Sequence, residues 1–235
     1  MTLDQIFDQL TYGELASLAI GGVNESKILV KDYPNVISHI NLGLTELYKR
    51  FTIKTEEVII QQYEQIETYY LDSKYAESND ESVEPIKYIM DSVFEPFTDN
   101  VLKIQEVYDE AGELLFKNDS EQHWSIYTPT YNSIQLPYPI NDNNLSVIFK
   151  ANHAKISPTI TDPTVVELEL PISHLEALLF YVASRIYSGM GTAESIQESS
   201  NYLMKFEESC KKLDSLGLTI RDETTNIKLH TRGFA

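Results

Sequence analysis

The sequence predicts an α+β protein: a helical bundle formed from both chain ends, with an inserted antiparallel β-rich domain and an extended C-terminal tail. Three observations predict it. Apolar residues recur at helical spacing near both ends of the chain, and the middle is rich in Ile, Val, Tyr and Thr. The terminal helices cannot bury their apolar stripes alone, which favours one shared bundle. The expected domains are the bundle at 1–51 and 171–217, the β-rich domain at 52–170 with an acidic loop region at 72–121, and a docking tail at 218–235.

The first two helices follow from capping and periodicity. Thr2 and Gln5 have the spacing of a capping box, and an amphipathic pattern follows them. Pro34 is placed to open the second helix, because proline is tolerated in the first turn. The apolar stripe of that helix is spaced by three and four, at Val36, Ile37, Ile40, Leu44, Leu47, Tyr48 and Phe51.

The middle of the chain changes period at Thr52. Residues 52–71 alternate in pieces and favour strands. Residues 72–100 show little periodicity and predict a loop with a short helix near 86–94. Residues 109–112 predict the turn of a hairpin within 103–117. Further strands are predicted at 125–128, 133–136, 145–151 and 165–170.

Two helices are predicted after residue 171. Ser173 and Glu176 are expected to form a second capping box. The sequence Gly189-Met190-Gly191 ends the first helix, and Thr192 caps the second one. So short a turn predicts that the two helices pack as an antiparallel pair, and Leu179 and Phe206 are both expected to be buried. The last 18 residues show no strong pattern.

Charge excludes one class of function. The chain has 18 Lys and Arg against 36 Asp and Glu, a net charge of −18, whereas a nucleic-acid binder needs a basic footprint. Residues 56–121 hold 18 acids and four bases. This is either a solvated surface that gives solubility or one that must not bind polyanions.

The longest apolar run, 177–183, is too short to span a membrane, and the acidic N-terminus argues against a secretory signal.

No catalytic, cofactor-binding or metal-binding residues are predicted, and no cofactor. The only cysteine, Cys210, lies on an apolar helical stripe and is interpreted as a buried hydrophobe. No two of the five histidines stand at metal-ligand spacing. The run from Gly189 to Thr192 lacks the third glycine of a dinucleotide fingerprint, and 142–146 lacks the glycine and Glu of a calcium loop. Nothing in these patterns favours an enzyme.

Two segments resemble a known family. Residues 33–51 contain Ile40-Asn41-Leu42-Gly43-Leu44 and end in Leu47-Tyr48-Lys49-Arg50-Phe51. Residues 168–185 contain Leu170-Pro171 and then Ala177-Leu178-Leu179-Phe180-Tyr181-Val182-Ala183. Both are similar to helices of tailed-phage head-to-tail adaptor proteins of the tail tubular protein A type, with the ring proteins of crAss-like phages as a more specific candidate. Residues 145–153 resemble the strand that precedes the second of these helices, whereas residues 72–121 match nothing in the family.

The resemblance implies a virion structural protein at the portal vertex, assembled in the host cytoplasm. It implies a homo-oligomeric ring, commonly of twelve subunits, that binds the portal protein above and a tail, nozzle or second ring protein below. DNA would pass through the lumen without specific binding, and no membrane would be involved. Two alternatives remain open: a soluble acidic binding module for a basic protein partner, and a hydrolase that uses unrecognised carboxylates.

Overall fold

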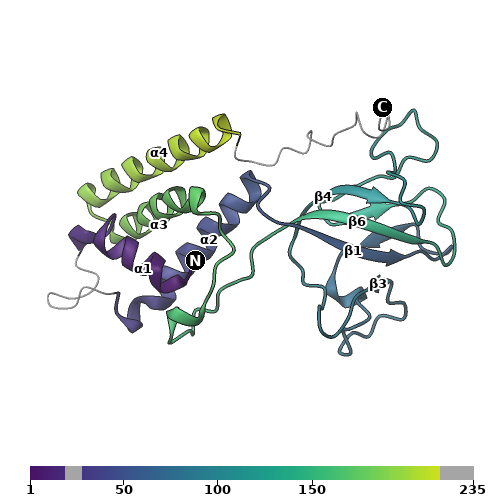
Figure 1. The fold of residues 1–235 in the computed structure, drawn as a ribbon, viewed down its shortest axis with the longest axis horizontal. Coiled ribbons are helices and arrows are strands. Elements are labelled where there is room, and N and C mark those ends of the chain that lie inside the picture. Colours follow the sequence, from purple (N-terminus) through teal and green to yellow (C-terminus); the bar gives the residue numbers. More distant parts are fainter. Residues whose placement is uncertain (19–27, 218–235) are drawn as a thin grey trace, which may run out of the picture. The chain divides into compact units, whose positions relative to one another are not determined.

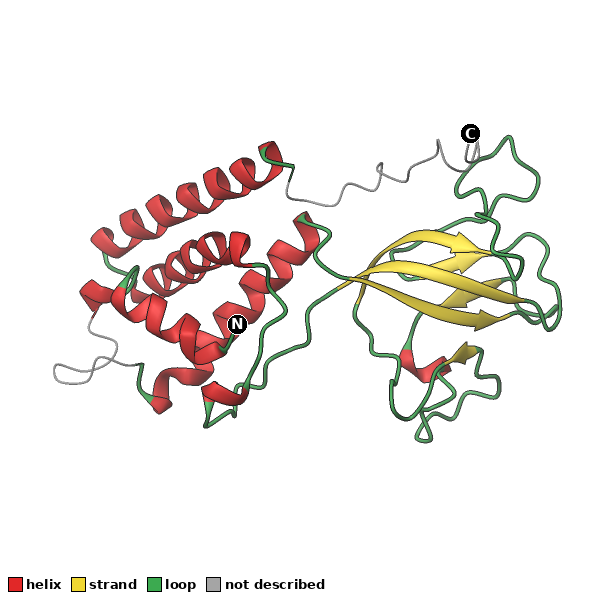
Figure 2. Ribbon diagram, viewed as in Figure 1, coloured by secondary structure: helices red, strands yellow, loops and turns green. Residues whose placement is uncertain are grey.

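The computed structural model describes residues 1–18 and 28–217, and within them the predicted mixture of helices and a small antiparallel sheet is confirmed (Figure 2). The chain divides into two compact units. The helical unit comprises Met1–Ile53 and His153–Ala235, and the β-rich unit comprises Lys54–Asn152. The predicted C-terminal tail at 218–235 lies outside the described residues.

Four α-helices build the described part of the helical unit (Figure 1). Their bounds are α1 (Leu3–Tyr12), α2 (Tyr33–Arg50), α3 (Leu175–Met190) and α4 (Ala193–Ser215). Short 3-10 turns η1, η2, η4 and η5 lie between them at Ala16–Leu18, Val30–Asp32, Pro163–Val165 and Ile172–His174.

The predicted helix starts are mostly confirmed. The Thr2 side chain accepts the Gln5 amide and the Gln5 side chain accepts the Thr2 amide, so the capping box forms. Pro34 lies in the first turn of α2, and Thr192 caps α4. The capping box predicted for Ser173 and Glu176 was wrong. α3 begins after His174 without a side-chain cap, because the Ser173 hydroxyl lies 3.1 Å from His174 Nδ1 instead.

α3 and α4 pack as an antiparallel pair. The start of α3 meets the end of α4, where Ser209 donates to Glu176, and the end of α3 meets the start of α4, where Tyr187 stacks on Tyr202. Gly191 adopts φ 71°, the left-handed conformation that lets the chain reverse after only two linking residues. Leu179 and Phe206 are both buried, as predicted.

α2 approaches α3 closely at Gly43. A Cβ on Gly43 would lie 2.7 Å from Leu178 Cδ1 and 3.0 Å from Tyr181 Cδ1, both on α3. The helix backbone can come this near only because the glycine has no side chain. The two segments are therefore in direct contact although about 130 residues separate them in the sequence.

The β-rich unit contains two antiparallel sheets. The larger one has the order β3-β1-β6-β4, with β1 (Thr55–Gln61), β3 (Ile89–Met90), β4 (Val101–Tyr108) and β6 (Asn144–Ala151). The smaller one pairs β2 (Thr68–Tyr70) with β5 (Ser133–Gln135), and the 3-10 turn η3 (Ser73–Tyr75) follows β2. Their shared core is apolar and buried; its largest members include Tyr69, Tyr88, Ile134, Phe149, Ile60 and Ile104.

Several segments in the middle of the chain have a different secondary structure from the one predicted. The short helix expected near residues 86–94 is instead strand β3 and a turn, because Ile89 and Met90 pair with β1. The hairpin turn at 109–112 is present, but its second arm makes only an isolated bridge from Leu114 to Tyr108. The expected strands at 125–128 and 165–170 are likewise reduced to isolated bridges, and the second segment begins at the last residue of the 3-10 turn η4.

The compact β-rich unit is shorter than the region 52–170 expected from the sequence. Residues 153–170 belong to the helical unit because their polar groups bond to it. His153 Nε2 lies 3.1 Å from Thr45 Oγ1, and the Asn41 side chain pairs with both backbone groups of Ile156. The chain therefore leaves the sheet directly after β6.

Candidate functional site

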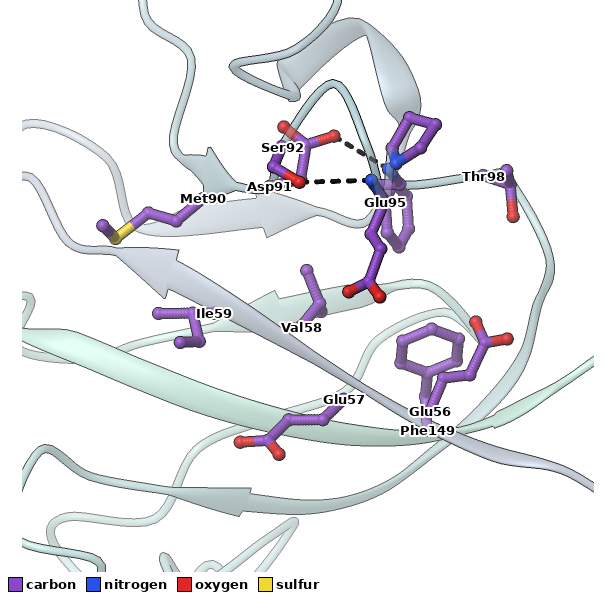
Figure 3. Close-up of a pocket in the computed structure, with 12 residues that line it drawn as sticks. Glu56, Glu57, Val58, Ile59, Met90, Asp91, Ser92, Glu95, Thr98 and Phe149 are labelled. Atoms are coloured by element: carbon purple, nitrogen blue, oxygen red, sulfur yellow. Dashed lines mark hydrogen bonds between the residues drawn. The ribbon is translucent and has the colours of Figure 1, made fainter.

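The candidate site is a groove in the β-rich unit, beside strand β1 (Figure 3). It has a volume of about 760 Å³. One wall is β1, and the other is the loop that follows β3. Its lining combines an apolar floor with carboxylates: Val58, Ile59, Met90, Pro96, Phe97 and Phe149, with Glu56, Glu57, Asp91 and Glu95, beside Ser92 and Thr98.

The backbone of β1 is only partly paired along this wall. Gln62 N donates to Asn143 O and Lys54 O accepts from Ala151 N, so even-numbered residues direct their backbone groups toward β6. Gln61 N donates to Tyr88 O, so odd-numbered residues direct theirs toward β3. β3 pairs only with Ile59 and Ile60.

An open strand edge follows from this pattern. The amide and carbonyl of Glu57, and those of Thr55, face the side of β3 but lie beyond its two residues. Among the described residues, no backbone partner reaches these groups on that side. The groove therefore lies beside a row of unpaired donors and acceptors, which is the usual template for adding another strand.

Asp91 holds the loop away from this edge. Its carboxylate accepts the Ser78 amide at 2.8 Å, the Ser78 hydroxyl at 2.5 Å and the Phe97 amide at 2.8 Å. Burial raises the pKa of Asp91, but these hydrogen bonds outweigh it and hold the pKa below its usual value. Figure 3 shows the bonds that fold residues 91–97 into a turn, so the chain after Met90 leaves β1.

The carboxylates of the groove differ in their partners. Glu56 is bonded by Lys54 at 3.0 Å and by the Asn100 side chain at 2.8 Å, and Glu57 accepts the Ser146 hydroxyl at 2.5 Å. The Glu95 carboxylate extends from the loop toward β1, and within the described ranges no hydrogen bond or ion pair reaches it. The lining holds four carboxylates and no basic side chain, so it favours a cationic ligand.

A second concave surface lies on α4. Leu203, Met204, Glu207, Glu208 and Lys211 line a hollow of about 380 Å³. Met204 is 63% exposed, and the exposed Ile196 lies on the same helix. α4 therefore presents apolar side chains away from the face that it packs on α3.

The candidate residues weighed from the sequence serve structural roles. Cys210 is buried, and burial raises its pKa to about 11, which leaves the thiol protonated. His174 is buried against Phe51 with ring centroids 4.9 Å apart, and burial lowers its pKa. Ser173 touches His174, but no carboxylate completes a triad at the free Nε2 of that histidine among the described residues.

Two further residues weighed from the sequence, His123 and Asp142, are exposed on the β-rich unit. His123 packs with Trp124 and Tyr138 on the surface of the β-rich unit, and His230 lies outside the described residues. Asp142 is in a turn, where its carboxylate accepts the Gln61 side chain at 3.2 Å. Within residues 1–18 and 28–217, no group of three or more His, Cys, Asp or Glu side chains could hold a metal ion.

The lysines of α4 are interleaved with aromatic and acidic groups. Lys205 Nζ lies 4.7 Å from the ring centroid of Tyr202, and Lys212 pairs with Glu208 at 3.1 Å. Lys211 shares the α4 hollow with Glu207 and Glu208. The positive charges on α4 are therefore balanced locally, which leaves no basic stripe there for a phosphate backbone.

The residues that carry the family resemblance in α2 join parts of the helical unit. The Tyr48 hydroxyl donates to the Glu169 carbonyl, and Phe51 packs on His174. Arg50 makes two 2.7 Å hydrogen bonds to Glu207, and its guanidinium lies 4.9 Å from the ring centroid of Phe206. These motifs thus fix how α2 meets α4 and the segment before α3.

Comparison with known proteins gives no assignment: no family model matches the chain, and neither does any curated protein sequence. None of the described helices combines the length and the apolar character that crossing a membrane requires.

The groove beside β1 was not predicted from the sequence. Its only signal was the change from strand pattern to acidic, aperiodic sequence after residue 71.

Proposed function

We propose that this chain is a virion structural protein, a head-to-tail adaptor that forms a ring beneath the portal and joins capsid to tail. The ring is proposed to contain twelve copies, to sit at the portal vertex and to let DNA pass through its lumen. A tail, nozzle or second ring protein would bind below it. No catalytic step, cofactor or membrane contact forms part of this role.

The observation that carries the proposal is that each unit exposes its own apolar surface. The helical unit exposes the α4 side chains around Met204. The β-rich unit exposes Trp124 and Tyr138, whose ring centroids lie 5.3 Å apart. Exposed apolar clusters on soluble domains mark protein–protein contacts, and two of them on separate units suit a protein that joins two partners.

The family resemblance is supported by the contacts of its residues. Gly43 and Arg50 bring α2 against α3 and α4, which come from the other end of the chain. This favours a bundle made from both ends with a β-rich domain inserted between them. A motif whose members all set helix packing suits a shared fold rather than shared chemistry.

The charge of the chain suits a DNA conduit. A net charge of −18 offers no release of counterions from a phosphate backbone, so DNA would be repelled rather than retained. Most of the excess acid lies in 56–121, within the β-rich unit. We therefore propose that acidic surface of this unit faces the passing DNA.

The mass of the assembled particle tests the proposal. The purified chain, alone and mixed with portal protein, is examined by light scattering and negative-stain imaging. A ring has a mass of several hundred kilodaltons, against 26.9 kDa for one chain. A species that stays monomeric in the presence of portal would refute the adaptor.

A second candidate function is favoured by the acidic groove. Four carboxylates and no basic side chain over an apolar floor could bind a basic segment of another protein. In that case the chain would be a monomeric binding module. A monomer that binds basic peptides without assembling would support this candidate over the ring.

A further inference from the structure

We propose that residues 226–235 of a second copy of this chain add as a strand to the open edge of β1 and fill the groove beside it. The inference rests on the proposed homo-oligomeric ring and names the contact that closes it. Three observations carry it: the unpaired backbone of β1, the alternation of the C-terminal sequence, and the opposite charges of the two segments.

The open edge can accept a strand of a few residues. Thr55 and Glu57 each direct an amide and a carbonyl toward the side where β3 has ended. The Asp91 turn keeps the loop from closing this side, and the groove fills the space between them. An added strand would continue the row of hydrogen bonds that β3 begins, and backbone bonds of this kind supply affinity in strand addition.

The C-terminal sequence has the matching alternation. In an extended strand, Ile227 and Leu229 point to one face, and Lys228, His230 and Arg232 point to the other. β1 has the same division, with Val58 on the buried face and Glu57 on the exposed face. Placing Ile227 and Leu229 on the side of Val58 and Phe149 therefore brings the basic side chains to the side of Glu57.

Charge complementarity singles out this segment. Residues 226–235 contain Lys228 and Arg232 and no acidic side chain, in a chain of net charge −18. Among the carboxylates of the groove lining, Glu57 lies on the face of β1 that would receive Lys228 and Arg232. Opposite charges at the rim guide the pairing and fix its register.

Exchange between copies follows from the geometry of a ring. A tail that enters the groove of the next copy makes a head-to-tail contact, and such contacts close into rings when the rotation between copies allows it. Each chain then supplies one tail and accepts one. All the open β1 edges are covered, which removes the aggregation hazard of an unpaired strand.

Disulfide trapping between two full-length variants tests the contact. One variant carries Glu57→Cys, and the other carries one added cysteine at one of positions 227–232. The natural Cys210 stays in both, because its buried, protonated thiol does not react. Mixed under mild oxidation, the pair should form interchain disulfides with cysteines at 228, 230 and 232 but not at 227, 229 and 231.

This period of two is the signature of an added strand, and nonspecific collision would not produce it. Glu110→Cys, in the exposed turn after β4, replaces Glu57→Cys as the matched control and should trap no position preferentially. Equal trapping at odd and even positions, or trapping equal to the control, would overturn the strand. Disulfides formed only within one chain carrying both cysteines would overturn the exchange.

Charge reversal supplies an independent measurement. Glu57→Lys should weaken association of the full-length chain about tenfold, and Lys228→Glu in the same chain should restore it. Loss without rescue contradicts the pairing. If the ring forms normally in the trapping controls and in Glu57→Lys, the strand exchange is wrong but the proposed adaptor function is not contradicted. If the wild-type chain never assembles, the proposed adaptor function itself is wrong.

Discussion

Each of the two units is stabilised internally by a different kind of contact. In the helical unit, apolar stripes meet along their length, as where Leu178 and Tyr181 of α3 crowd Gly43 of α2. In the β-rich unit, the long connections are fixed by side chains that bond to distant backbone amides. Asp91 binds Ser78 and Phe97, and Asp99 binds the Ser73 amide at 2.7 Å.

This difference teaches where each unit is vulnerable. A stripe distributes its stabilisation over many side chains, so it resists small changes but not a buried charge. A carboxylate that gathers three hydrogen bonds concentrates its effect in one residue. Two probes separate the units in solution: far-ultraviolet circular dichroism is dominated by the helices, and the single tryptophan, Trp124, lies in the β-rich unit.

The largest effect is expected from Leu179→Asp in the helical unit. Leu179 is buried on α3, so the carboxylate would lose its hydration without gaining a partner. The free energy of unfolding should fall by about 3–5 kcal/mol, seen as an earlier loss of the helical signal. Ile196→Asp on the exposed face of α4 is the control and should change it little. Equal stability of Leu179→Asp and wild type would contradict the packing of the pair.

A smaller effect is expected from Asp91→Asn in the β-rich unit. The hydrogen bonds from Ser78 and Phe97 lose their charged acceptor, which should cost about 2 kcal/mol at pH 7. Because the folded-state pKa is depressed, this stabilisation is present above the usual value of 3.8 and is lost as pH falls through the folded pKa. The difference between Asp91→Asn and wild type, followed by Trp124 fluorescence, should therefore narrow toward pH 3.

The matched control for that prediction is Asp80→Asn. Asp80 is exposed in the same connection, and no hydrogen bond reaches its carboxylate among the described residues. Asp80→Asn should leave the unfolding transition, followed by Trp124 fluorescence, unchanged at every pH. An Asp91→Asn transition that moves no more than this control would mean that the loop does not depend on the carboxylate.

The same comparison explains what the sequence could predict. α1, α2, α3 and α4 were predicted because a stripe of period 3.6 is visible locally, and their caps lie within three residues of the helix start. β1 and β6 were predicted from their β-branched alternation. The cap at Ser173 failed because the hydroxyl had a competing partner next to it, His174.

The groove could not be predicted because it depends on contacts between distant residues. β3 is only two residues long and takes its conformation from pairing with Ile59 and Ile60. The turn that opens the groove depends on Asp91 bonding to Ser78, thirteen residues away. Neither leaves a periodic trace, and so the same segment was predicted as a short helix.

A still smaller effect is expected where α2 meets α4. Arg50 forms a fork with Glu207 and also bonds Glu46, and the pair is partly exposed. Arg50→Lys keeps the charge but loses the two-point geometry, so it should cost about 1 kcal/mol. The interaction is measured by a double-mutant cycle with Glu207→Gln, using thermal unfolding. A coupling energy near zero would show that apolar packing alone joins these helices.

The smallest effect is expected at Glu14, and it has the opposite sign. One oxygen of its carboxyl group is buried without a hydrogen-bond partner, although the Glu14 carbonyl accepts the hydroxyls of Tyr187 and Tyr202. Burial raises the pKa of this carboxyl, Glu176 adds to the rise, and Lys205 offsets part of it. The Glu14 carboxyl is therefore a polar group that the packing of the helical unit does not satisfy.

Replacing Glu14 with glutamine should stabilise the helical unit. A raised folded-state pKa means that the native chain holds its proton longer, so stability falls as pH rises from the usual value of 4.5 through the folded pKa. Glu14→Gln removes this penalty, which is below about 1 kcal/mol because solvent screens a half-buried group. Its melting temperature should exceed that of wild type at pH 7 and match it at pH 4, whereas the exposed Glu198→Gln should show no such convergence. A variant less stable at pH 7 would show instead that the carboxylate is stabilised by its surroundings, and the helical unit would then depend on a polar contact as the β-rich unit does.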